Sequence, residues 1–146
     1  MNFFSAMEIA SSGLSAQRTR MNVLASNLAN ARTTRRDDGE GPYRRLDPVF
    51  RSAPLSSRFA DLVNDRHAQN AFVVEVPEIR EDETPPQLVY EPNHPDANGE
   101  GYLELPNVNV VEEMVNMITA SRAYESGVTV MQSIKSMARS AISIAG

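Results

Sequence analysis

The longest regular pattern in this chain is a row of apolar residues in the C-terminal segment 107–142. The residues are spaced alternately by three and four positions, which is the a/d heptad pattern of a helix that packs along another helix. The row consists of Val110, Met114, Met117, Tyr124, Val128, Met131, Ala138 and Ile142, and only Ser121 and Lys135 interrupt it. A second row, which includes Val111, Val115 and Ile118, lies beside the first, so this helix is expected to touch more than one neighbour. The spacing alone fits an assembly helix and the longest helix of an ordinary bundle about equally well.

The N-terminal segment 3–31 carries a similar row and is therefore a candidate partner for the C-terminal helix. Its members are Phe3, Met7, Ala10, Leu14, Met21, Leu24, Leu28 and Ala31, and only Gln17 breaks the spacing. We expect this helix to end near Ala31, because the Gly-rich polar segment 37–42 follows. The C-terminal helix is expected to begin after Pro106, with Asn107 or Asn109 as its N-cap and with Glu112 and Glu113 in its first turn.

Composition excludes several classes of protein. The chain has no Cys, so disulfides, thiolate metal sites and cysteine nucleophiles are excluded. No apolar run is long enough to cross a membrane, and the N-terminus lacks the basic and apolar regions of a cleavable signal peptide. The basic cluster Arg32, Arg35, Arg36, Arg44 and Arg45 is interleaved with acidic residues, which favours a solvated loop over a nucleic-acid site.

The central segment predicts a small β unit. Candidate strands are Tyr43–Arg51, interrupted at Pro48, then 72–79, 88–90 and 102–105, and they could form a meander. In the second of these, Phe72, Val74 and Val76 alternate with other residues and predict one buried face. Residues 52–70 fit either one or two helical turns or a flexible insertion. The prediction is an α+β fold with a helix at 1–34, a β-rich region at 35–106 and a helix at 107–146.

No residue set predicts catalysis or a cofactor. His67 and His94 are isolated and are expected at the surface. The loop Asp96–Gly101 matches the first half of an EF-hand, with oxygen ligands at Asp96, Asn98 and Glu100. Its twelfth position is Asn107 instead of Glu and strands are expected on both sides, so a turn is favoured. A calcium-dependent binding or adhesion module is the alternative function, and an enzyme is not expected.

Two segments carry a resemblance to a known family. The segment 11–34, SSGLSAQRTRMNVLASNLANARTT, resembles the N-terminal signature of the axial proteins of the bacterial flagellum, the rod and hook family. The segment 88–138 resembles a short basal-body rod member of that family. The signature residues are Asn27, Asn30, Tyr90, Pro92, His94, Pro95, Asp96, Asn98, Tyr102, Pro106 and Asn107.

The resemblance implies a structural subunit of the proximal rod, the periplasm-spanning drive shaft of the flagellar basal body. Its terminal helices would pair as an antiparallel coiled coil, and the β unit would pack outside. The implied partners are further copies, other rod proteins, the proteins of the MS-ring/rod junction and the flagellar type III export apparatus, which exports such proteins without a cleaved signal peptide. Nucleic acid, direct membrane insertion, metals and cofactors are not implied. The expected assembly contacts are Met7, Leu14, Met21, Leu24, Leu28, Met114, Met117, Ile118, Tyr124, Val128 and Met131.

Overall fold

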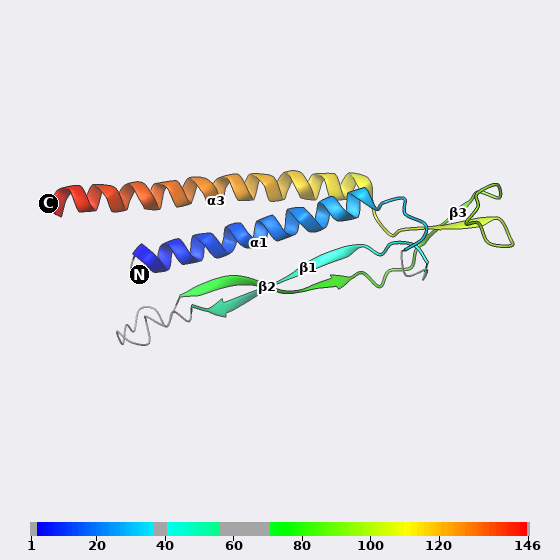
Figure 1. The fold of residues 1–146 in the computed structure, drawn as a ribbon, viewed down its shortest axis with the longest axis horizontal. Coiled ribbons are helices and arrows are strands. Elements are labelled where there is room, and N and C mark those ends of the chain that lie inside the picture. The colour runs from blue at the N-terminus through cyan, green and yellow to red at the C-terminus, as the bar shows by residue number, and fades with distance from the viewer. Residues whose placement is uncertain (1–2, 37–40, 56–70, 146) are drawn as a thin grey trace. The chain divides into compact units, whose positions relative to one another are not determined.

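The computed structural model describes residues 3–36, 41–55 and 71–145 and has the predicted α+β content (Figure 1). The elements are α1 (Phe3–Ala29), β1 (Leu46–Pro54), β2 (Phe72–Glu81), β3 (Gln87–Tyr90), β4 (Tyr102–Leu105) and α3 (Val110–Ala145). The long helices stand at the two ends of the chain and the strands lie between them in sequence, as predicted. The chain divides into two compact units, which are described separately.

Unit 1 consists of Met1–Thr19, Val49–Pro77 and Ala120–Gly146. The backbone N–H of Val74 in β2 donates to the Ser12 hydroxyl of α1 at 3.2 Å. The buried apolar residues among the described part of this unit are Ala16, Leu55 and Ala120, so Leu55 is the only one of them larger than alanine. The many Ala and Ser residues of α1 contribute to this result, because small side chains allow close packing but remove little apolar surface from water.

Unit 2 consists of Arg20–Pro48 and Glu78–Thr119 and contains the hairpin of β3 and β4. These strands are antiparallel, with Gln87 opposite Leu105 and Tyr90 opposite Tyr102, whose rings meet edge to face at 5.3 Å. Gly101 has a φ of +81°, and a Cβ atom there would lie 3.0 Å from the Tyr90 ring. The hairpin therefore requires glycine at this position, both for its backbone conformation and for the close approach of the ring.

Asparagine side chains define the ends of both long helices in unit 2. Asn30 follows the last residue of α1, and its Nδ2 donates to the Ser26 carbonyl at 3.0 Å. At the start of α3, the Asn109 Oδ1 accepts from the N–H groups of Val111 at 3.1 Å and Glu112 at 3.4 Å. Of the two predicted N-caps, Asn109 is therefore the one that caps the helix, and Asn107 has a different role, described below.

The predicted β meander is wrong. In the described residues β1 pairs only with β2, and β3 pairs only with β4, in two separate two-stranded sheets. The connection from β2 to β3 contains Pro85 and Pro86, which lack backbone N–H donors and do not extend a hydrogen-bonded ladder. Pro48 does not interrupt β1, because each strand of a two-stranded sheet has an edge that needs no donor.

Two further predictions concern the central segment: a buried face on the second strand, and helical turns or a flexible insertion at 52–70. Phe72 and Val74 are exposed, so the predicted buried face of β2 is wrong at these residues. A two-stranded ribbon has too little covering structure to bury a complete face. The segment predicted as helical turns or a flexible insertion falls largely on 56–70, outside the described residues, while 52–54 continue β1.

Candidate functional site

The candidate functional site is the surface of the two long helices, because the residues expected to mediate assembly lie there. On α3 a row of residues that turn away from solvent is spaced by four and three positions. The row consists of Glu113, Met117, Ala120, Tyr124, Gly127, Met131, Ile134 and Ala138, and we call this set the α3 seam. Asn116, Ser121 and Val128 are also partly buried and lie beside it. Four of these positions were expected from the apolar row. The seam also includes Glu113, Ala120 and Gly127, which hydrophobic periodicity alone does not select.

Within unit 1 the seam lies close to α1 at Gly127. A Cβ atom on Gly127 would lie 2.9 Å from Cδ2 of Leu14 and 3.4 Å from its Cγ. Atoms this close repel each other, so the missing side chain of Gly127 leaves the space that Leu14 fills. The glycine therefore has a packing role here and is more than a flexible point in the helix.

A second set of apolar residues on α3 remains exposed. Val111, Val115 and Ile118 are 71%, 58% and 54% exposed, and we call these three residues the outer row. They lie in unit 2 at the start of the helix. Contiguous exposed apolar side chains of this kind mark interaction surfaces in soluble proteins.

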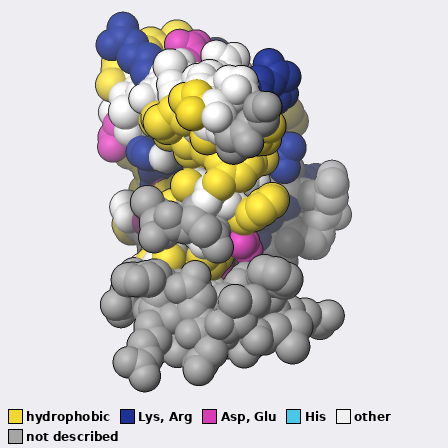
Figure 2. Space-filling view, turned by 90° about the vertical axis from the view of Figure 1, so that its left-hand side faces the viewer, with side chains coloured by type: hydrophobic (Ala, Val, Ile, Leu, Met, Phe, Trp, Pro, Cys, Tyr) yellow, Lys and Arg dark blue, Asp and Glu magenta, His cyan; other side chains and the backbone are white. Residues whose placement is uncertain are grey.

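Exposed apolar side chains also occur in unit 1, near the start of α1 and the end of α3. Phe4 and Ile144 are among the most exposed of them. Figure 2 shows apolar side chains gathered over much of the described surface on the side of Figure 1 where both chain ends are marked. The surface of the helices is therefore apolar well beyond the part that the subunit itself buries.

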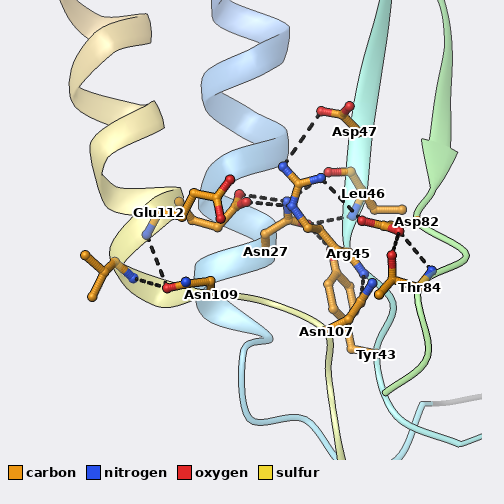
Figure 3. Close-up of polar contacts among 12 residues, drawn as sticks. Asn27, Tyr43, Arg45, Leu46, Asp47, Asp82, Thr84, Asn107, Asn109 and Glu112 are labelled. Atoms are coloured by element: carbon orange, nitrogen blue, oxygen red, sulfur yellow. Dashed lines mark hydrogen bonds and ion pairs between the residues drawn. The ribbon is translucent and has the colours of Figure 1, made fainter. Parts of the chain in front are cut away.

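A buried polar cluster in unit 2 joins both helices to β1 (Figure 3). Its centre is Asn27 of α1, which is 0% exposed. The Asn27 Nδ2 donates to the Leu46 carbonyl and to Glu113 Oε2, both at 2.9 Å. Its Oδ1 accepts from the Leu46 N–H and the Tyr43 hydroxyl, also both at 2.9 Å. Asn27 thus uses its full hydrogen-bonding capacity, two donors and two acceptors.

Glu113 of α3 is the charged member of this cluster and is 1% exposed. Its Oε1 accepts from the Arg45 Nε at 2.7 Å, while its Oε2 accepts from Asn27. A buried carboxylate needs such partners, because removal from water is costly unless the charge is paired and hydrogen-bonded. Glu113 therefore does more than occupy the predicted first turn of α3, because it also forms a buried ion pair with Arg45.

Arg45 connects the cluster to further carboxylates at the unit surface. Its guanidinium lies 3.7 Å from Asp82 and 4.0 Å from Asp47, and its backbone N–H donates to the Asn107 Oδ1 at 3.0 Å. Burial alone would lower the pKa of Arg45, but the hydrogen bond and charge of Glu113, with Asp47 and Asp82, raise it above its ordinary value. The prediction of a solvated Arg45 is wrong, because its side chain is 20% exposed and paired with Glu113. The prediction missed this pair because Glu113 lies 68 positions away in the chain.

Asp82 is held in its charged form by its neighbours. The hydroxyl and the backbone N–H of Thr84 both donate to its carboxylate, at 2.6 and 2.9 Å. These two hydrogen bonds, with the nearby charge of Arg45, lower the pKa of Asp82 below its ordinary value.

The loop Asp96–Gly101 is a turn in which the side-chain oxygen atoms of Asp96 and Asn98 are bonded within the protein. Asp96 accepts from the Thr34 hydroxyl at 2.8 Å and pairs with Arg35 at 3.2 Å. The Asn98 Oδ1 accepts from the N–H groups of Glu100 and Tyr102. In the described part of the chain no three His, Cys, Asp or Glu side chains are grouped as a metal site would need. The loop therefore gives no support to the calcium-binding alternative.

The signature residues predicted from the resemblance have identifiable structural roles in unit 2. Asn27 and Asn107 bind the segment 43–46, Asn30 ends α1, Pro106 is fully buried before α3, and Asn98 closes the β3–β4 turn. Sequence reasoning did not connect Tyr43, Arg45 and Glu113, which it assigned separately to a candidate strand, to the basic cluster and to the first turn of the C-terminal helix. A buried polar cluster of this kind becomes visible only when distant segments are brought together.

The expected assembly contacts are divided between buried and exposed positions. Leu24 is buried, and Leu14, Met21, Leu28, Met117, Tyr124, Val128 and Met131 are partly buried. Met7, Met114 and Ile118 are exposed. Among the described residues neither long helix is long and apolar enough to span a membrane.

Comparison with protein families identifies the class to which these features belong. Residues 7–35 match the family described as "Flagella basal body rod protein", and residues 100–144 match "Flagellar basal body rod FlgEFG protein C-terminal". The two matches cover most of α1 and almost all of α3, the elements that carry the candidate site. The fold and site are thus those of a flagellar basal-body rod protein.

Comparison with individual proteins identifies the family more closely. The chain is 45% identical to the flagellar basal-body rod protein FlgC of Borreliella burgdorferi, over 99% of this chain and 98% of that protein. It is 39% identical to FlgC of Bacillus subtilis, over 99% of each chain, and 42% identical to FlgC of Escherichia coli, over 94% and 93%. The chain belongs to the FlgC family of flagellar basal-body rod proteins. It is a structural subunit of the rod and not an enzyme, which confirms the prediction made from the resemblance.

Proposed function

We propose that this chain is a subunit of the proximal rod and polymerises through its terminal helices into the drive shaft that crosses the periplasm. The observation that carries this proposal is the outer row on α3. Its three apolar side chains are more than half exposed in a chain whose relatives are named as basal-body rod proteins. Burying this row against neighbouring subunits would remove apolar surface from water and stabilise the polymer.

The proposal includes the pairing of α1 and α3 as an antiparallel coiled coil. In unit 1 Leu14 packs against Gly127, and in unit 2 Asn27 bonds to Glu113. A later position on α1 thus corresponds to an earlier position on α3, as antiparallel pairing requires. The proposed organisation is a helix at 1–34, a β-rich region at 35–106 and a helix at 107–146.

Two groups of residues would act in assembly. Exposed residues such as Met7, Met114 and Ile118 would contact neighbouring subunits directly. The more buried residues, among them Leu14, Leu24 and Met117, would hold the helices together so that the outer row is presented correctly.

The proposed partners follow from the same position in the rod. They are further copies of this chain, other rod proteins and the proteins of the MS-ring/rod junction. The flagellar type III apparatus would export the subunit without cleavage of a signal peptide. Among the described residues of unit 1 only Leu55 is a buried apolar side chain larger than alanine, which supports this route because so little apolar burial stabilises a fold weakly.

Deletion of the gene followed by purification of basal bodies tests the proposed function. We expect basal bodies that retain the membrane ring but lack the rod, and we expect a plasmid copy of the gene to restore rods and swimming. Normal rods in the deletion strain would contradict the assignment.

A further inference from the structure

The buried polar cluster can make helix pairing selective, which the apolar residues of the seam cannot do alone. The largest fully buried side chains in the described residues are Glu113, Asn27 and Pro106, and two of these are polar. A core that gained stability only from burial would place apolar side chains there, because replacing a buried ion pair with apolar residues of similar volume is often neutral or stabilising. The cluster is therefore better explained by selectivity than by stability.

The apolar residues of the helices are poorly selective between partners. Rows of Leu, Met, Val and Ala at heptad spacing pack against any similar row, and each subunit carries two such rows. In an assembly many copies of both helices are close together, so pairing of α3 with the α3 of another copy competes with pairing of α3 with α1. Something other than apolar contact must discriminate between these two arrangements.

We propose that Asn27, Arg45 and Glu113 are the specificity-determining residues of helix pairing, and that they exclude homotypic pairing of the α3 seam with the α3 seam of a second copy. This inference rests on the proposed pairing of α1 with α3. It names the residues that select that pairing.

The contacts of the cluster give the physical basis. Glu113 finds its two donors on Arg45 and on Asn27, which come from the segment before β1 and from α1. If two α3 seams met, each would bring the Glu113 carboxylate, and neither would bring the Arg45 guanidinium or the Asn27 amide that pairs with it. Each carboxylate would be buried without these two donors, and Asn27 would keep a buried amide without its Glu113 acceptor. Only the heterotypic arrangement satisfies all of these groups.

The test replaces the cluster by apolar residues of similar size in the full-length chain. The triple variant Asn27→Leu, Arg45→Met and Glu113→Met keeps the volume of the junction but removes its polarity. Because the natural chain has no Cys, Thr119→Cys on the exposed surface of α3 provides a single labelling position. Chains labelled with a donor dye and chains labelled with an acceptor dye are mixed, and energy transfer reports α3–α3 pairing.

Both chains are compared below the concentration at which the parent polymerises through its outer row. There we expect the triple variant to keep the helix content of the parent, to at least double in apparent mass from 16.1 kDa, and to show energy transfer that the parent lacks. The control is Glu112→Met, which adds an exposed apolar side chain at the adjacent position and should stay like the parent.

Four results would overturn the proposal. The triple variant could stay monomeric, lose its helix content, or associate without energy transfer between the dyes. The fourth result is energy transfer of equal strength in the parent. Loss of helix would mean that the cluster acts through stability alone. Rod formation in cells is not part of this measurement, so its outcome and that of the gene deletion can be distinguished.

Discussion

Truncation of Glu113 to alanine is predicted to be among the most destabilising single changes in unit 2. The substitution removes the acceptor of a 2.7 Å charge-assisted hydrogen bond from Arg45 and of a 2.9 Å hydrogen bond from Asn27. Breaking one side of a buried ion pair costs roughly 3–5 kcal/mol. The Arg45 side chain is 20% exposed and retains Asp82 at 3.7 Å, which places the expected loss near the lower limit, at about 3 kcal/mol.

Urea denaturation followed by circular dichroism measures this loss. With a urea dependence of about 2 kcal/mol per molar for a protein of this size, 3 kcal/mol corresponds to a midpoint lower by roughly 1.5 M. The matched control is Glu112→Ala, one residue earlier and exposed, which should change the free energy of unfolding by no more than about 0.5 kcal/mol. Equal midpoints for the two variants would refute the assignment of Glu113 to a buried, fully bonded cluster.

Three other substitutions test separate contacts. Gly101→Ala should lower the free energy of unfolding by about 1–3 kcal/mol in urea titrations, because the φ of Gly101 is +81° and the added Cβ would meet the Tyr90 ring. The control is Gly99→Ala, whose added Cβ meets nothing within 4 Å and which should have little effect. Gly127→Leu should cost about 1–3 kcal/mol by overpacking against α1, and a melting temperature equal to that of the parent would count against the contact. Thr84→Val should remove stabilisation from the Asp82 carboxylate, whose pKa is lowered in the folded state. The difference from the parent should therefore be full above pH of about 4 and should disappear as the pH falls through the folded-state pKa, and a difference independent of pH would contradict this.

The sequence predicted the elements of the fold better than the contacts between them. Heptad spacing located α1 and α3 to within a few residues, because long amphipathic helices are encoded locally. It located the α3 seam only in part, since two apolar rows lie next to each other on the helix and the seam includes Glu113 and Gly127. Hydrophobicity selects neither a charged residue that finds a buried partner nor a glycine that accommodates a neighbouring leucine.

Long-range pairing explains the remaining differences between prediction and structure. Arg45 looked like one of several loop arginines, because Glu113 is 68 positions away in the chain. The strands at 88–90 and 102–105 were correctly located, but whether β2 continued into the same sheet depended on contacts that no local pattern contains. The signature asparagines were recognised by resemblance, and their hydrogen bonds supply the physical reason for them.

The central claim is that neighbouring subunits bury the outer row of α3, and substitution of Ile118 tests it most directly. Ile118→Asp places a charge on a side chain that is 54% exposed, so the subunit itself should fold, be produced and be exported normally. The control is Leu88→Asp on β3, which is 63% exposed but lies outside the helices. The measurement is the presence of rods in basal bodies purified from cells whose only copy is the variant. The account predicts rods with Leu88→Asp and none with Ile118→Asp, and intact rods with Ile118→Asp would contradict it.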